Sequence, residues 1–204
     1  EAAGLIDPER EAEHQGIDDD EGTGDPQVLT YNAFAKRIID EHGVRLGREP
    51  NSVLITDGAR HQLAYRVVCR TTLPLAEFGK SPINLTGELL ALDDQLADLA
   101  ISPLALIEHD QEAIAQLQGH DALQGIGKKM LATSQLRVAL AGLVIQWRAE
   151  KLARDVQDFA DQTRLALELV QAFPDIAEKV RAHFAVVLLD EYQDTSIAQR
   201  MLLQ

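Results

Sequence analysis

Residues 186–196 have the sequence Val-Val-Leu-Leu-Asp-Glu-Tyr-Gln-Asp-Thr-Ser, an apolar run that ends in two acids. With Ala185 the apolar run is five residues long, and two of the five are β-branched. This pattern is typical of a strand that is buried on both faces, as in a parallel sheet covered by helices. A buried strand needs partners, so we expect a larger sheet that includes residues 28–30 and further strands outside this chain.

The acids Asp190 and Glu191 then lie at the carboxyl end of the predicted strand, which is the edge where open α/β sheets bind their ligands. Mg²⁺ takes one or two carboxylates together with phosphate oxygens and water. One acid can hold the metal while its neighbour orients or deprotonates a water molecule. The pattern favours a Walker B site, with an unrelated strand that ends in surface acids as the simpler alternative.

The composition limits the class of protein. The chain has 204 residues, 46% of them hydrophobic and 25% charged, enough for one good core or two modest ones. No apolar run approaches the roughly 18 residues of a membrane span, so we expect no membrane partner. The lone Cys69 excludes a disulfide scaffold and fits a reducing, cytoplasmic setting, and we expect it to be buried on a helix.

The net charge of −14 by itself argues against a nucleic-acid partner. However, residues 1–27 contain ten acids and one basic residue, so the remainder carries only −5. This first segment has few large apolar residues, and we predict that it is an acidic flexible segment. Since the chain opens with Glu1 and ends at Gln204 inside an apolar, helix-like stretch, we interpret it as a piece of a longer polypeptide.

Apolar residues recur at helical spacing between the two predicted strands. A first helix has Phe34, Ile38 and Ile39 on one face and ends at Gly43. From about residue 73 to 153 the pattern is entirely helical, with a long helix over 135–152. Its inward residues are expected to be Leu136, Leu140, Leu143, Val144 and Trp147, and another stripe consists of Leu89, Leu92, Leu96 and Leu99.

Capping residues predict where several helices begin and end. Asp57 begins a helix that carries Leu63, Val67 and Val68, and the pair Ser102-Pro103 begins one that ends at Gly119. Asp158 begins the helix that precedes the Walker B-like stretch. That helix is expected to turn Phe159, Leu165, Leu169 and Val170 inward and to end before Pro174.

The full string at 190–196, Asp-Glu-Tyr-Gln-Asp-Thr-Ser, resembles motif II of the UvrD/Rep family of superfamily-1 DNA helicases, whose form is Asp-Glu-(Phe/Tyr)-Gln-Asp. Residues 30–35, Thr-Tyr-Asn-Ala-Phe-Ala, are similar to the family's Thr-Phe-His-Ser-Phe-Ala segment, which touches single-stranded DNA. Asn32 stands where the family has His. The string Asp-Phe-Ala-Asp-Gln at 158–162 is similar to the segment that precedes motif II in this family. Together with residues 46–47 and 89–93, this string resembles the sequences of actinobacterial AdnB-type motor subunits.

The resemblance implies a mainly α fold with a small α/β portion. This portion is an incomplete RecA-like P-loop NTPase domain, called 1A, with parallel strands at both ends and a helical insertion called 1B. We expect residues 28–59 to be part of 1A, residues 60–153 to be the 1B insertion, and residues 154–204 to return to 1A with motif II.

The resemblance also implies the function of the intact protein, an ATP-dependent DNA helicase or translocase that moves 3′ to 5′ in DNA repair or recombination. Its cofactors are ATP and Mg²⁺. Its partners are a junction of single-stranded and duplex DNA and, for AdnB-type members, a partner helicase-nuclease subunit. In this scheme Asp190 binds the Mg²⁺ of MgATP, Glu191 acts on the attacking water, Gln193 senses the γ-phosphate and Asp194 braces the loop. Thr30 and Asn32 contact the single strand.

The stretch Gly-Ile-Gly-Lys-Lys at 125–129 is similar to a phosphate-binding loop, but Ala122 replaces the first glycine and Lys129 the Ser/Thr. We therefore predict a turn between helices, which in the family's 1B region presents Lys128 and Lys129 to duplex DNA. Since the 204 residues contain no Walker A motif, the chain alone is expected to be inactive. Two alternatives stay open: a non-catalytic helical protein-interaction domain, and a translocase that does not separate strands.

Overall fold

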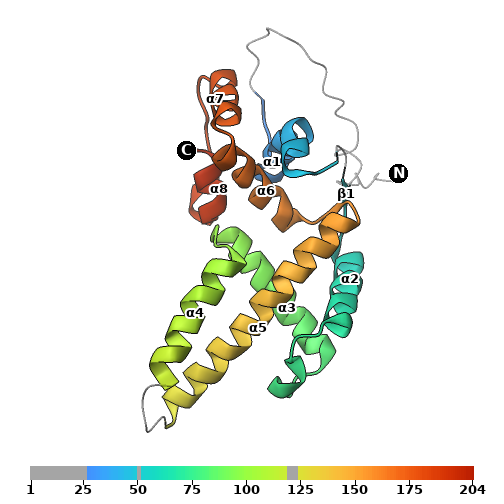
Figure 1. Cartoon of the computed structure of the whole chain (residues 1–204). Coiled ribbons are helices and arrows are strands. Elements are labelled where there is room, and N and C mark those ends of the chain that lie inside the picture. Colours follow the sequence, from blue (N-terminus) through green and yellow to red (C-terminus); the bar gives the residue numbers. More distant parts are fainter. Residues whose placement is uncertain (1–26, 50–51, 119–123) are drawn as a thin grey trace, which may run out of the picture.

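Helices account for most of the chain in the computed structural model, which describes residues 27–49, 52–118 and 124–204 (Figure 1). The α-helices are α1 (Tyr31–His42), α2 (Asp57–Arg70), α3 (Pro82–Asp98), α4 (Pro103–Gln118), α5 (Ile126–Ala153), α6 (Phe159–Ala172), α7 (Pro174–His183) and α8 (Ile197–Leu202). Short 3₁₀ helices are η1 (Gly43–Leu46), η2 (Leu75–Phe78) and η3 (Tyr192–Asp194). The strands are β1 (Val53–Leu54) and β2 (Val156–Gln157).

One core lies where α2, α3 and α5 pack together, and α4 and α5 form a long hairpin that extends away from the rest of the molecule (Figure 1). The expected stripes are largely confirmed, since Leu89, Leu143, Val144 and Trp147 are fully buried. Leu99 is an exception, because α3 ends at Asp98 and leaves its side chain 45% exposed.

A second core lies between α1, α6, α7 and α8 (Figure 1). Ile38 and Ile39 of α1 are buried there against Leu165 and Leu169 of α6, which confirms the predicted apolar faces of both helices. Phe159, predicted to point inward, is instead 53% exposed, because it is the first residue of α6 and precedes the buried face.

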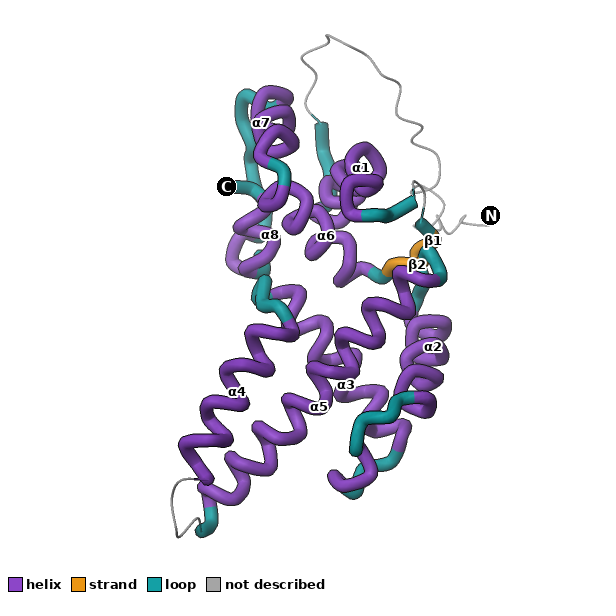
Figure 2. The backbone as a smooth tube through the Cα atoms, viewed as in Figure 1, coloured by secondary structure: helices purple, strands orange, loops and turns teal. Residues whose placement is uncertain are grey.

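The two strands form a short parallel ladder that joins the two cores (Figure 2). Val53 pairs with Val156 and Leu54 with Gln157. The chain therefore leaves this ladder after β1, builds helices α2 to α5, and returns to the neighbouring strand. We call helices α2 to α5 the helical unit. It begins and ends next to the paired residues of β1 and β2, where it joins the rest of the described chain.

The strands predicted at 28–30 and 185–189 are wrong for this structure. Residues 28–30 lead into α1 without a strand partner, and Val28 is 95% exposed. Residues 185–189 also form no strand, and Val186 and Leu188 are 75% and 90% exposed. A strand needs a neighbouring backbone and a cover for its apolar faces, and the described residues provide neither at these places.

Most predicted helix ends are confirmed. The side chain of Ser102 accepts a hydrogen bond from the backbone N–H of Ala105, at 3.0 Å, at the start of α4. Asp158 caps α6 and forms a reciprocal capping box with Asp161. Helix α6 ends before Pro174, which begins α7. The predicted end at Gly119 lies outside the described residues.

Three local predictions are corrected. Asp57 is the first residue of α2 and does not cap it, because Thr56 holds the capping position. The stretch at 125–129 is not only a turn, since α5 begins at Ile126 and both lysines belong to its first turn. Cys69 is exposed on α2, because the buried face of that helix is formed by its neighbours Val67 and Val68.

None of the helices in the described part is long and apolar enough to cross a lipid bilayer.

Candidate functional site

Asp190 and Glu191 lie in a sharp turn between the extended apolar run and η3. Both are exposed. Glu191 has a φ of 49°, in the left-handed region that residues with a β-carbon adopt at a cost of roughly 1 kcal/mol. Backbone strain of this kind is common at functional sites, although Ala100 and Asp155 share it here.

Local hydrogen bonds orient the polar side chains of this turn. One carboxylate oxygen of Asp190, Oδ1, accepts a hydrogen bond from the backbone N–H of Glu191 at 2.9 Å. The amide Nε2 of Gln193 donates to the Glu191 carboxylate. Asp194 donates its backbone N–H to the carbonyl oxygen of Glu191 at 2.9 Å, which closes the turn. The two acids thus present carboxylate oxygens to solvent from one short segment.

The predicted DNA segment lies at the amino end of α1. Thr30 caps the helix, and its Oγ1 accepts a hydrogen bond from the backbone N–H of Ala33 at 3.1 Å. The next residue, Tyr31, places its hydroxyl 3.0 Å from Oγ1 of Thr195 in a hydrogen bond. The structure therefore brings the segment of Thr30 and Asn32 next to the segment of Asp190, Glu191 and Gln193, although they are far apart in the sequence.

Asn32 lines an open cleft of about 390 Å³ together with Gln199 of α8 and Phe159 and Thr163 of α6. The cleft also has Arg60 and four aspartates in its wall, which are Asp57, Asp94, Asp98 and Asp158. It therefore offers amide, hydroxyl and aromatic groups in an acidic surrounding. Phosphate groups are disfavoured near these carboxylates, so the cleft suits uncharged parts of a ligand better.

Lys128 and Lys129 are not brought to this site. They are exposed in the first turn of α5, at the far tip of the α4–α5 hairpin, whereas motif II lies beside α8 at the other end of the molecule (Figure 1). Their position at a helix amino terminus, where backbone N–H groups lack partners, favours contact with an anion.

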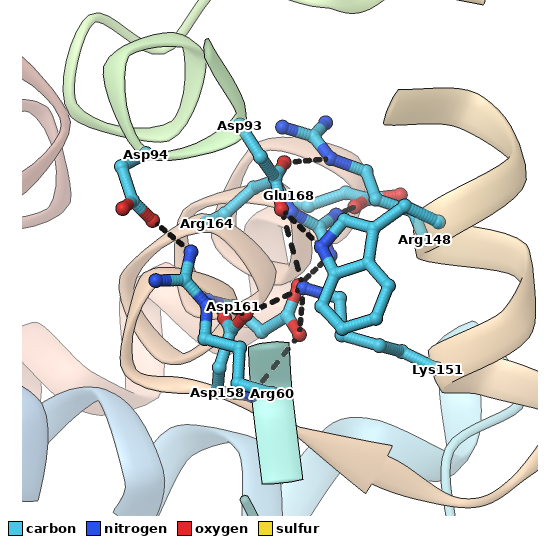
Figure 3. A network of polar contacts seen from close by, with 10 residues as sticks. Arg60, Asp93, Asp94, Arg148, Lys151, Asp158, Asp161, Arg164 and Glu168 are labelled. Carbon is cyan, nitrogen blue, oxygen red and sulfur yellow. Dashed lines mark hydrogen bonds and ion pairs between the residues drawn. The ribbon is translucent and has the colours of Figure 1, made fainter. Parts of the chain in front are cut away.

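A buried charge network, absent from the sequence-based predictions, joins the helical unit to α6 (Figure 3). At its centre is Lys151 of α5, which is fully buried. Its ammonium nitrogen Nζ lies 2.7 Å from Asp161, 2.9 Å from Asp158 and 3.3 Å from Asp93. A buried cation with three carboxylates in reach is stabilised by strong, directional contacts.

Arginines pair with each of these carboxylates from the outside. Arg60 of α2 contacts Asp158 at 2.9 Å and also pairs with Asp94. Arg148 contacts Asp93 at 2.7 Å, and Arg164 contacts Asp161 at 2.6 Å. The indole Nε1 of Trp147 donates to Asp93 at 2.8 Å. The network therefore ties α2, α3, α5 and α6 together at the junction of the two cores.

These contacts shift the pKa of Asp161. Burial alone raises the pKa of this carboxyl, but the charges of Lys151 and Arg164 and their hydrogen bonds outweigh burial and hold it well below its usual range. For Asp94, burial is the largest effect, and together with the nearby charges of Asp158 and Asp93 it raises the pKa despite the hydrogen bond and charge of Arg60. Asp161 thus remains ionised in the folded protein, as the network requires.

One signal in the sequence pointed to part of this network. The sequence predicts Asp158 as the cap of α6, and the spacing of Asp161 and Arg164 is typical of an ion pair on one helix turn. Nothing in the sequence placed Lys151 or Asp93 beside them, because these contacts join residues far apart in the chain.

The comparisons with known proteins agree with the motif. The model of the UvrD/REP helicase N-terminal domain matches residues 10–204. Over 129 residues the chain is 35% identical to the ATP-dependent DNA helicase UvrD1 of Mycobacterium tuberculosis, an alignment that covers 63% of this chain and 16% of the relative.

Two further relatives also match parts of the chain. The ATP-dependent DNA helicase PcrA of Leuconostoc citreum is 25% identical over 172 residues, with 84% of this chain and 19% of the relative covered. An ATP-dependent helicase/nuclease subunit of Streptococcus equi subsp. zooepidemicus is 31% identical over 134 residues, with 62% and 11% covered. The chain thus spans less than a fifth of the length of these relatives. The motif at 190–196 and the match over nearly the whole chain show that it belongs to the UvrD/REP helicase N-terminal domain family.

Proposed function

We propose that the intact protein is an ATP-dependent DNA helicase or translocase that moves 3′ to 5′ along single-stranded DNA and acts in DNA repair or recombination. The observation that carries the proposal is the exposed pair Asp190–Glu191, in a turn that is hydrogen-bonded to the start of α1 through Thr195. Family membership and the names of the relatives, ATP-dependent DNA helicases, support the same function.

The donor set at this turn fits Mg²⁺ bound together with ATP. Mg²⁺ prefers carboxylate oxygens and keeps several waters, and Asp190 and Glu191 offer exposed carboxylates without a competing cation in the described part of the chain. When bound, MgATP supplies the phosphoryl group that is transferred to water. In this proposal Asp190 holds the metal, Glu191 orients the attacking water and accepts its proton, and Gln193 senses the γ-phosphate. Asp194 braces the loop.

The proposed path of the DNA follows two exposed helix starts. Thr30 and Asn32, at the start of α1, contact the single strand, and the amide of Asn32 is accessible from the cleft it lines. Lys128 and Lys129, at the start of α5, contact the backbone of the duplex. We assign residues 28–59 and 154–204 to a RecA-like domain 1A and residues 60–153 to the 1B insertion.

The test of this function uses the full-length protein and the substitution Glu191→Gln, which keeps the size of the side chain and removes its charge. We expect DNA-stimulated ATP hydrolysis to fall by about 10²–10⁴-fold, the contribution of a general base, while ATP still binds. The control is Glu178→Gln, a matched change on the exposed surface of α7, which should retain wild-type hydrolysis. Normal hydrolysis by the Glu191→Gln protein would exclude the proposed role of this residue.

A strand-separation assay distinguishes a helicase from a translocase. If the full-length protein hydrolyses ATP on single-stranded DNA but does not release a labelled strand from a duplex with a 3′ tail, it is a translocase without unwinding activity. Because two relatives are named as helicase/nuclease or exonuclease/helicase subunits, we include a partner helicase-nuclease subunit in the proposal. The isolated 204 residues, without a Walker A motif, are expected to show no ATPase activity.

A further inference from the structure

One hydrogen bond joins the two segments that the proposed function assigns to DNA and to ATP. Tyr31 is the first residue of α1 and directly follows Thr30, and Thr195 directly follows η3. Their hydroxyl oxygens lie 3.0 Å apart, and both side chains are partly buried. Within residues 27–49, 52–118 and 124–204, no other hydrogen bond or ion pair connects α1 to residues 190–196.

Both ends of this bond are held in place by their own elements. On one side, Thr30 caps α1 and its carbonyl oxygen accepts the backbone N–H of Phe34 at 3.0 Å. On the other side, Thr195 donates its backbone N–H to the carbonyl oxygen of Tyr192 at 3.2 Å. Ser196 then begins α8 with a reciprocal capping box to Gln199. Each of the two hydroxyl groups is thus carried by a backbone segment with hydrogen bonds of its own.

The hydroxyl of Tyr31 is a property of this sequence. The segment that residues 30–35 resemble has Phe at this position, and a Phe ring keeps the packing but cannot form the bond. The pair of hydroxyls is thus an addition to the motifs themselves.

We propose that Tyr31 is a positioning residue that couples DNA contact at the start of α1, through Thr195, to the turn that carries Asp190, Glu191 and Gln193. The inference rests on the proposed function and adds a specific regulation of the same site. DNA bound at Thr30 and Asn32 fixes the first turn of α1, and the Tyr31–Thr195 bond then holds the turn in the arrangement that acts on ATP. Tyr31 contacts no reacting atom, so its effect is on the coupling and not on the chemistry.

The experiment measures coupling in the full-length protein with the substitution Tyr31→Phe. We expect ATP hydrolysis without DNA, the KM for ATP and the Kd for a single-stranded oligonucleotide to match the wild type. The DNA-stimulated kcat should fall by about two- to tenfold, the range that one neutral hydrogen bond supplies. A defect of general folding would instead lower the basal activity as well, so the ratio of stimulated to basal kcat is the decisive quantity.

Further variants establish that the bond itself is responsible. Thr195→Val should lose the same stimulation as Tyr31→Phe, and the double variant should lose no more than either single one, because both remove the same contact. Thr195→Ser retains a hydroxyl and should restore most of the stimulation. Tyr65→Phe, on the exposed surface of α2, is the matched control and should behave like the wild type.

Two results with the variant proteins would overturn the inference. One is wild-type stimulation in the Tyr31→Phe protein. The other is a double variant whose loss equals the product of the two single losses. If the wild-type protein itself shows no DNA-stimulated hydrolysis, the proposed function fails and the coupling fails with it. If wild-type stimulation is present and Tyr31→Phe leaves it unchanged, only the coupling is refuted.

Discussion

At the scale of single residues, Lys151 is held on all sides by its charged neighbours. Its side chain is fully buried, and its ammonium group contacts three carboxylates. Removing one member of a buried ion pair is costly because the partner charge stays in a poorly hydrated place. Here each carboxylate keeps an arginine partner, which lowers the cost.

We therefore expect Lys151→Met to reduce the free energy of unfolding by about 3 kcal/mol, at the lower end of the range for broken buried pairs. Urea unfolding followed by circular dichroism measures this difference. Lys179→Met, on the exposed surface of α7, is the matched control and should change stability by less than about 0.5 kcal/mol. Similar stability of the two variants would show that Lys151 does not hold the network together.

The pH dependence of stability follows from Asp161. Its pKa is lower in the folded protein than in the unfolded chain, because Lys151 and Arg164 outweigh the effect of burial. The stabilisation is complete above the unfolded value of about 3.9 and is lost as the pH falls below it. We expect a lower urea midpoint at pH 3 than at pH 5, and a smaller difference between these pH values in Asp161→Asn. Asp98→Asn, which changes an exposed aspartate at the end of α3, should keep the wild-type difference.

At the scale of elements, local signals explain what the sequence could predict. The starts of α4 and α6 follow from Ser102 and Asp158, because a cap acts on backbone groups two or three residues away. The buried faces of α1 and α5 follow from periodicity. The strands could not be predicted from local signals, because a strand is defined by a partner elsewhere in the structure. Strand β2 has only two residues, and the apolar run at 185–189 has no strand partner among the described residues.

The candidate site shows the same limit. Asp190, Glu191 and Gln193 stand out in one contiguous motif. In the structure the two acids are exposed neighbours in a turn, but the strand and sheet edge expected to carry them are not formed by the described residues. Their roles, and those of Thr30, Asn32, Lys128 and Lys129, stay predictions. The Tyr31–Thr195 bond and the contacts of Lys151 join distant positions, so no local pattern could predict them.

At the scale of the whole molecule, the exposed apolar run decides how the 204 residues behave in isolation. Val186, Val187 and Leu188 are more than half exposed, and a contiguous apolar segment with free backbone groups promotes association. We expect the isolated chain to form larger species as its concentration rises, measured by light scattering after size-exclusion chromatography. Leu188→Lys should reduce this association, whereas Leu104→Lys, at an exposed position of α4, should not. A monomer at all concentrations would contradict this expectation.

The two-residue ladder between β1 and β2 has a consequence for how this architecture can change. Because Val53 and Val156 are paired neighbours, everything between them begins and ends within one strand spacing, about 4.8 Å. Bringing together the ends of this long segment costs little more free energy than for a short segment, since the entropic cost of loop closure grows only with the logarithm of the segment length. The helical unit can therefore be lengthened, trimmed or exchanged for another whose ends meet, provided that the replacement again supplies cations for Asp158 and Asp161.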